Sequence, residues 1–151
     1  MPAPSSLYSA SAVVPPVTLV VAAIIAREDG TILIAQRPPS SKLSGMWEFP
    51  GGKVEPGEGP RAALVRECHE ELGCDVEAGA VYETIFHRVG NHCILLLFYL
   101  TRVVKGEPQP MERNALAWVT PANMRLYALL EPDRPLIDLF ERRFPMFEQG
   151  A

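Results

Sequence analysis

The sequence predicts an α/β domain in which helices cover a mixed sheet. Two observations carry this prediction: β-rich runs and helix signals follow one another in the order β, β, α, β, β, β, α, and no internal repeat interrupts that order. Such an order is typical of layered α/β folds. The chain has 151 residues, of which 48% are hydrophobic and 21% are charged, and this suits one globular domain.

The N-terminal part of the chain predicts an arm followed by two strands. Residues 1–16 are rich in Pro, Ser and Ala and carry no charge, which predicts a disordered arm. Residues 17–26 form an apolar, β-rich run that is shorter than the ~20 residues of a membrane span. A signal peptide would carry Lys or Arg before such a run, and none precedes it here. Asp29-Gly30 predicts a hairpin turn before a second strand at 31–35.

Residues 60–72 predict a helix with defined ends. Pro60 suits the first helical turn, where its missing N–H would have no partner. Gly73 suits the left-handed position just past the helix end. Leu64, Cys68 and Leu72 recur at i, i+4 and i+8, so they predict the apolar stripe that packs on the sheet.

The C-terminal half predicts three strands and a second helix. The strands are expected at 81–87, 93–104 and 115–119, and the helix at 135–144. We therefore expect one domain over residues 17–146 and a short tail over residues 147–151.

Charge and cysteine content exclude several classes of protein. The net charge of −4 argues against a protein that coats DNA or RNA, which would carry a basic excess. The three cysteines show no CxxC spacing, so they fit neither a disulfide framework nor a structural zinc site. We expect reduced thiols in a cytoplasmic protein, with no membrane and no nucleic-acid polymer among its partners.

Three carboxylates lie along one edge of the helix expected at 60–72. Glu67 and Glu71 are spaced i, i+4, and Glu70 follows Glu67 at i+3, so the three repel one another unless a cation neutralises them. Oxygen donors of this kind suit Mg²⁺ or Mn²⁺. Arg66 lies one turn from Glu70 and could hold the geometry of the cluster. A solvated acidic helix face is the alternative interpretation.

The segment before this helix supplies groups suited to a phosphate and a base. Gly51 and Gly52 let the backbone approach a ligand closely, and Lys53 adds a cation beside them. Trp47 and Phe49 add aromatic surface to the same segment. Combined with the carboxylates of the helix, these residues predict a metal–phosphate site with a stacked base.

Residues 52–74 resemble the Nudix box, GX5EX7REUXEEXGU. All fixed polar and glycine positions match, from Gly52 through Glu58 to the run RECHEELGC at 66–74. Two aliphatic positions of the box hold cysteine instead, and since cysteine packs as a small hydrophobe we expect looser packing with the chemistry retained. Residues 45–53 are similar to the MutT branch of the family. This resemblance implies a Nudix-type α/β/α sandwich with a mixed central sheet.

The resemblance also implies a reaction and a metal site. Nudix enzymes hydrolyse a nucleoside diphosphate linked to another group, and in the MutT branch water attacks a nucleoside triphosphate to give a monophosphate and pyrophosphate. The implied cofactor is Mg²⁺, with Mn²⁺ as a substitute. The implied catalytic residues are Glu67, Glu70 and Arg66, with Glu67 favoured as the base. The implied metal ligands are the Gly51 carbonyl, Glu67, Glu70, Glu71 and, from its spacing six residues before Trp118, Glu112, for which a loop surface charge is the alternative.

Recognition of the base is expected to depend on Arg37 and Asp133. Arg37 matches a basic residue that contacts the nucleotide in this branch, with a surface salt bridge as the alternative. Asp133 stands where MutT enzymes have an asparagine, and a carboxylate suits the hydrogen-bond donors of guanine or cytosine. Asp133 could instead cap the helix that begins at Pro135. The expected substrate-binding residues are Arg37, Phe49, Gly52, Lys53 and Asp133.

These residues leave several functions open. The first is a housecleaning hydrolase for an oxidised nucleotide such as 8-oxo-dGTP, a role in nucleotide pool sanitation and DNA repair. The second acts on CTP, dCTP or 5-methyl-dCTP. Hydrolysis of NADH or ADP-ribose is disfavoured, because the NADH hallmark is absent and residues 75–107 hold no proline. A noncatalytic nucleotide-binding Nudix module is the alternative of another class. The expected partner is the triphosphate substrate, bound by a monomer or a homodimer.

Overall fold

The computed structural model describes residues 16–113 and 115–148, and its strands form two sheets. The larger sheet has the strand order β4-β1-β6-β5, and the smaller has the order β3-β2-β7. The strands are β1 (Val17–Ile25), β2 (Ile32–Gln36), β3 (Trp47–Glu48), β4 (Gly51–Lys53), β5 (Asp75–Val89), β6 (His92–Lys105) and β7 (Ala115–Val119). β1 is parallel to β6 and antiparallel to β4, so the predicted mixed sheet is confirmed.

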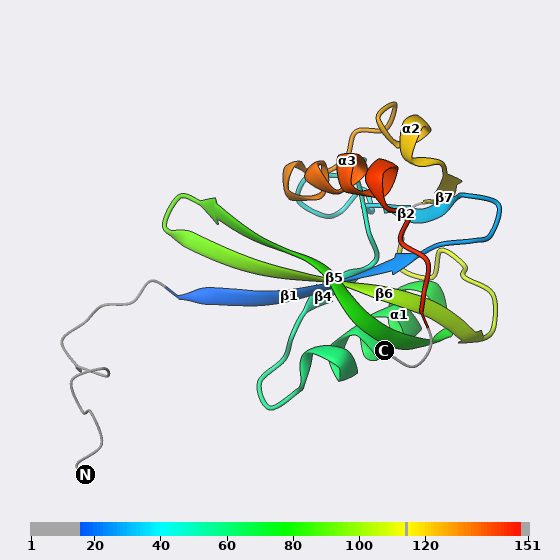
Figure 1. The fold of residues 1–151 in the computed structure, drawn as a ribbon. Helices are drawn as coiled ribbons and strands as arrows, with labels where there is room; N and C mark the ends of the chain where they lie inside the picture. The colour runs from blue at the N-terminus through cyan, green and yellow to red at the C-terminus, as the bar shows by residue number, and fades with distance from the viewer. Residues whose placement is uncertain (1–15, 114, 149–151) are drawn as a thin grey trace, which may run out of the picture.

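Helices lie on opposite sides of these strands (Figure 1). The helices are α1 (Pro60–Leu72), α2 (Pro121–Met124) and α3 (Pro135–Arg142), and a 3₁₀ turn over Glu131–Asp133 precedes α3. α1 covers one face of the larger sheet, and α2 and α3 cover the other side. The predicted α/β/α layering is therefore confirmed.

β1 lies between the two helical layers, and this explains its apolar sequence. Successive strand residues point to opposite faces of a sheet. Accordingly, Val21 and Ala23 pack in the core beneath α1, whereas Ala22 and Ile24 pack in the core beneath α3. A strand that is buried on both faces requires a near-continuous apolar run.

α1 begins and ends where the sequence predicts. Pro60 occupies its first turn, and Gly73 ends it in the left-handed conformation with φ = 65°. The backbone N–H of Gly73 donates to the His69 carbonyl, which completes the cap. Leu64 and Cys68 are fully buried against the sheet, so the predicted apolar stripe is confirmed.

The predicted hairpin at Asp29-Gly30 is only partly correct. The turn forms, with the Arg27 N–H donating to the Thr31 carbonyl. However, β1 and β2 then enter different sheets, and an isolated bridge between Ala26 and Ile32 joins them. The physical reason is that β1 already has a partner on each edge in β4 and β6.

Several elements differ in extent from the sequence prediction. β3, β4 and α2 are too short for a periodic pattern to reveal. β5 begins six residues before the predicted strand at 81–87, and register shifts interrupt its pairing with β6. The expected arm at 1–16 and the tail at 147–151 lie largely outside the described residues, so those domain limits stay predictions. In the described part of the chain, no helix is both long and apolar enough to cross a membrane.

Candidate active site

A cavity of about 470 Å³ opens between β1, β4, α1 and the loops around them. It brings together most of the site residues that the sequence predicts. These are Arg37, Phe49, Gly51, Gly52, Lys53, Glu67, Glu71, Glu112 and Asp133. Arg66 and Glu70 do not line the cavity.

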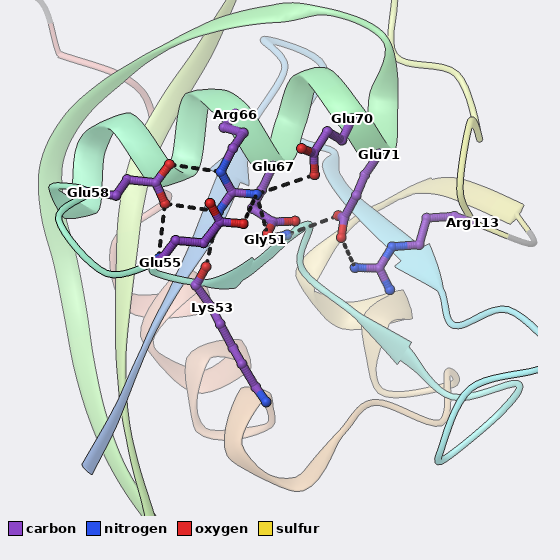
Figure 2. Close-up of polar contacts among 9 residues, drawn as sticks. All are labelled: Gly51, Lys53, Glu55, Glu58, Arg66, Glu67, Glu70, Glu71 and Arg113. Atoms are coloured by element: carbon purple, nitrogen blue, oxygen red, sulfur yellow. Dashed lines mark hydrogen bonds and ion pairs between the residues drawn. The ribbon is translucent and has the colours of Figure 1, made fainter. Parts of the chain in front are cut away.

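Arg66 binds carboxylates of α1 and of the loop before it (Figure 2). Its Nε and Nη2 donate to the two oxygens of Glu58 at 2.8 and 2.9 Å. Nη1 donates to Glu67 Oε1 at 2.9 Å and to Glu70 Oε2 at 3.3 Å, and Nη2 also reaches the Lys53 carbonyl at 3.1 Å. The hydrogen bond with Glu58 is the main cause of the raised pKa of Arg66, so this guanidinium stays charged. It therefore ties the loop before α1 to the helix.

Glu67 lies directly against the backbone of β4. A Cβ atom on Gly52 would lie 2.5 Å from the Glu67 carboxyl carbon, so only glycine leaves room for this carboxylate. Burial raises the pKa of Glu67, while the hydrogen bond from Arg66 acts in the opposite direction. The glycine thus shapes a cradle for a carboxylate at the cavity wall.

Glu71 is buried, and both of its carboxylate oxygens have partners. Oε2 accepts the backbone N–H of Gly51 at 3.2 Å, and Oε1 accepts Arg113 Nη2 at 2.8 Å. Burial raises the pKa of Glu71 to about 7, against the lowering effect of the Arg113 charge. Glu71 is thus the most strongly desolvated of the three glutamates.

Arg113 and Glu48 are site residues that sequence reasoning missed. Arg113 donates to Glu48 as well as to Glu71, and only 7% of its side chain is exposed. Burial alone would lower the pKa of Arg113, but Glu71 and Glu48 outweigh it and raise that pKa. Glu48 lies in the segment 45–53 that resembles the MutT branch, so its place in that segment could have indicated a site residue. Arg113 follows the predicted ligand Glu112 and carries no motif of its own.

The loop that carries Arg113 is docked on the end of α1. The backbone N–H of Gln109 donates to the Leu72 carbonyl at 2.8 Å, and that of Met111 donates to the Glu71 carbonyl at 3.1 Å. These carbonyls have no partner within the helix itself, because the last turn of any helix leaves its carbonyls free. This docking places Arg113 beside Glu71 and Glu112 at the cavity wall.

The three glutamates that the sequence places along one edge of α1 differ in how they face the cavity. Glu70 has 45% of its side chain exposed and turns toward Arg66, away from the cavity. Within residues 16–113 and 115–148, no three side chains of His, Cys, Asp or Glu stand close enough together to hold a metal ion. In this arrangement Arg66 pairs with Glu67, and Arg113 pairs with Glu71. The donor set is nevertheless one of hard oxygen atoms, the kind that Mg²⁺ prefers.

The predicted phosphate and base groups differ in how they face the cavity. The ammonium end of Lys53 extends away from the glutamates (Figure 2). Phe49 is only 3% exposed, because its ring packs edge-on against Phe98 and Phe140 in the core. The expected stacking of a base on Phe49 therefore has little support in this geometry. Trp47, the other aromatic residue of this segment, packs against Tyr127 and does not line the cavity.

Arg37 lies on the other side of Glu48. Its Nη1 donates to Glu48 Oε1 at 3.0 Å, and its Nε donates to the Lys42 carbonyl at 2.7 Å. The salt bridge is partly buried at the cavity wall and is not a surface pair. Glu48 thus joins Arg37 to Arg113, and through it to Glu71.

Asp133 does not cap α3, so that alternative is wrong. It lies inside the 3₁₀ turn, and the residue at the helix N-cap is Arg134, which makes no side-chain cap. Asp133 is instead buried at the cavity, where its Oδ2 accepts the Phe49 N–H at 3.4 Å. Burial raises its pKa well above the ordinary value, and the nearby charge of Glu48 adds to the shift.

Comparison with known proteins gives consistent matches. Residues 16–140 match the model of the NUDIX domain. The "CTP pyrophosphohydrolase" of Escherichia coli (strain K12) is 45% identical over 121 residues, which are 80% of this chain and 89% of that protein. The "8-oxo-dGTP diphosphatase" of Proteus vulgaris is 41% identical over 88 residues, 58% of this chain and 79% of that protein. The solution structure of the E. coli ORF135 protein matches with a TM-score of 0.72 and 42% identity, covering 83% of this chain and 89% of that one.

The buried carboxyl of Asp133 predicts a stability difference that depends on pH. A raised pKa in the folded state means that stability falls as pH rises from the ordinary value of 3.8 toward the raised one. Asp133→Asn has no proton to lose, so its melting temperature relative to wild type should increase with pH across this window. Thermal melts over a pH series measure the difference.

Asp138→Asn is the matched control for this series. Asp138 is exposed, and its hydrogen bond with Arg125 lowers its pKa. The wild-type carboxylate therefore contributes stability that appears as pH rises, so the melting temperature of Asp138→Asn relative to wild type should not increase with pH. A difference for Asp133→Asn that stays constant with pH would contradict the buried, protonated state.

Proposed function

This chain belongs to the NUDIX domain family, and on that premise we propose that it is a Mg²⁺-dependent pyrophosphohydrolase that converts a (deoxy)nucleoside triphosphate, with 8-oxo-dGTP as the first candidate, to the monophosphate and pyrophosphate. The observation that carries this proposal is that one cavity is lined by Glu67 and Glu71 of α1 and also by Arg37 and Asp133. Groups suited to a metal–phosphate and groups suited to a base thus face the same space.

The metal ligands that we propose are those implied by the Nudix box. They are the Gly51 carbonyl, Glu67, Glu70, Glu71 and Glu112. Glu67, Glu71 and Glu112 line the cavity already, whereas Glu70 would have to turn from Arg66 to join them. A bound Mg²⁺ supplies charge neutralisation for the phosphates and lowers the pKa of water.

Glu67 is the general base that we propose, with Arg66 as the residue that orients it. Arg66 holds Glu67 Oε1, which leaves Oε2 to accept the proton of the attacking water. The oxygen of that water forms a bond with the α- or β-phosphorus, the bond from that phosphorus to the oxygen that bridges them breaks, and the departing group keeps the electron pair, so that either attack gives a monophosphate and pyrophosphate. Positioning and charge stabilisation supply most of the catalysis in phosphoryl transfer.

Asp133 is the residue that we propose for reading the base. A protonated carboxyl offers one hydrogen-bond donor and one acceptor. Guanine presents two acceptors, N7 and O6, on its major-groove edge. Oxidation at C8 places a hydrogen on N7, so 8-oxoguanine presents a donor beside O6. This pairing of donor with acceptor favours the oxidised base over guanine at a protonated Asp133.

Cytidine triphosphates are the second candidate substrates. The supporting observation is the 45% identity to the E. coli protein named CTP pyrophosphohydrolase. Cytosine also presents a donor, its N4 amine, beside an acceptor, N3, so Asp133 fits either base. A noncatalytic module fits less well, because the chain keeps all the glutamates of the box. Free, buried cysteines suit the reducing cytoplasm, the compartment that we propose.

The products of the reaction test the proposed chemistry. The purified protein, incubated with Mg²⁺ and a panel of triphosphates including 8-oxo-dGTP, dGTP, CTP, dCTP and 5-methyl-dCTP, should release pyrophosphate and a monophosphate. Chromatography of the nucleotides with separate assays for pyrophosphate and phosphate measures both. Phosphate as the first product, with a diphosphate left over, would rule out this proposal.

Glu71→Gln tests the metal site. An amide is a neutral and poorer ligand for Mg²⁺ than a carboxylate, so turnover should fall by orders of magnitude while the circular dichroism spectrum stays that of the wild type. Glu141→Gln, on the exposed face of α3, is the matched control and should keep wild-type turnover. Near-normal Mg²⁺-dependent activity of Glu71→Gln would contradict the assignment.

Asp133→Ala tests recognition of the base. Loss of one buried hydrogen bond to the base costs about 1–3 kcal/mol, roughly a ten- to hundredfold loss in kcat/KM for the preferred triphosphate. Non-preferred triphosphates should change less, so the preference becomes flatter while the dependence on Mg²⁺ concentration stays the same. An unchanged preference in the same panel would remove Asp133 from base recognition.

A further inference from the structure

A metal ion that binds Glu71 would share its carboxylate with two present partners. Its Oε2 accepts the Gly51 N–H, and its Oε1 accepts the Arg113 guanidinium. The two partners differ in mobility. Gly51 is held in β4 by its pairing with Ala22 of β1. Arg113 is a long side chain on a loop, so Oε1 is the oxygen that can be released.

The loop allows Arg113 to leave Glu71 without losing its own place. The backbone hydrogen bonds of Gln109 and Met111 to the end of α1 hold the loop independently of the Arg113 side chain. Arg113 also has a second carboxylate partner in Glu48, which Arg37 holds from the other side. A guanidinium that releases Glu71 therefore still has Glu48 as a counter-charge.

Charge balance explains why Arg113 occupies this position. Glu71 is largely removed from water, and an unpaired carboxylate there would be strongly destabilising. A divalent cation at Oε1 would supply the same neutralisation, but it would repel a guanidinium at hydrogen-bond distance from the same oxygen. The two cations therefore compete for one carboxylate oxygen.

We propose that Arg113 is the resident counter-cation of Glu71, and that a divalent metal ion must displace it from Oε1 in order to bind. The inference rests on the proposed function in one respect, that Glu71 is a metal ligand. It assigns Arg113 as a positioning residue. Its charge neutralises Glu71 and thereby weakens the binding of a metal ion to that carboxylate. Coupling between two sites is reciprocal, so removing Arg113 should tighten the binding of the metal ion.

Binding of Mn²⁺ in the absence of nucleotide tests this exchange. Free Mn²⁺ is measured by electron paramagnetic resonance during titration of the whole chain, at the same mildly alkaline pH for every variant. Arg113→Gln should bind Mn²⁺ about fivefold or more tightly than wild type. Its metal-free melting temperature should fall, and its rise in melting temperature on adding Mn²⁺ should exceed that of wild type.

Two further variants keep the test decisive. Arg113→Lys keeps the charge but lacks the fork that spans Glu48 and Glu71, so it should fold and bind Mn²⁺ more tightly than wild type but less tightly than Arg113→Gln. Arg125→Gln removes an arginine that pairs with Asp138 and Glu141 away from the cavity, and its Mn²⁺ affinity should equal that of wild type.

The outcomes separate this inference from the proposed function. Mn²⁺ binding that is equal or weaker in Arg113→Gln and Arg113→Lys than in wild type overturns the exchange, even if wild type hydrolyses triphosphates. Absence of Mn²⁺ binding to every variant overturns the metal site and the exchange together. Tighter binding in both Arg113 variants supports the exchange whichever triphosphate proves to be the substrate.

Discussion

The burial of the Glu67 and Glu71 carboxylates on α1 depends on two arginines that neutralise their charge. Arg66 approaches from the helix itself and holds Glu67 and Glu58, whereas Arg113 approaches from a loop and holds Glu71. Removing one partner of a buried ion pair costs about 3–5 kcal/mol, because it leaves the other charge desolvated and unpaired. Loss of either guanidinium group without another cation in its place therefore lowers the stability of the fold.

The same constraint explains the glycines of β4. Gly52 faces the Glu67 carboxylate, so a side chain there would displace that carboxylate, and Gly51 faces the backbone of β1, so a side chain there would push β4 and β1 apart. The close approach also lets the Gly51 N–H donate to Glu71. The two glycines thus allow β4 to pair closely with β1 and leave room for the Glu67 carboxylate.

Glu48 extends this charge network across the cavity. It pairs with Arg37 on one side and with Arg113 on the other, and its charge contributes to the raised pKa of Asp133. The groups proposed for the base and those proposed for the metal are therefore linked through one carboxylate. A change in the partners of Arg113 would alter the electrostatic surroundings of both, since effective dielectric constants are low in such a site.

Local patterns in the sequence determined much of the fold. The helix over 60–72, its Pro60 start and its Gly73 end follow from caps and periodicity, which act within a few residues. The strand at 115–119 and the buried run of β1 follow from β-rich composition, although the division into two sheets does not. The motif likewise indicated the family and four residues of the cavity wall, Gly52, Lys53, Glu67 and Glu71, because these lie within 23 residues, from Gly52 to Cys74.

Only the tertiary structure decided which charges meet. Arg113 lies 42 residues from Glu71 and 65 from Glu48, and Asp133 lies 84 residues from Phe49. Strand register and the docking of a loop on the end of α1 bring these residues together. No local sequence pattern encodes either feature. The sequence by itself therefore determined the helix that carries the carboxylates, the glycines that receive it and the class of chemistry. The fold decided that Asp133 is buried beside the cavity and that an arginine neutralises Glu71, because side-chain pairing depends on which distant segments packing brings together.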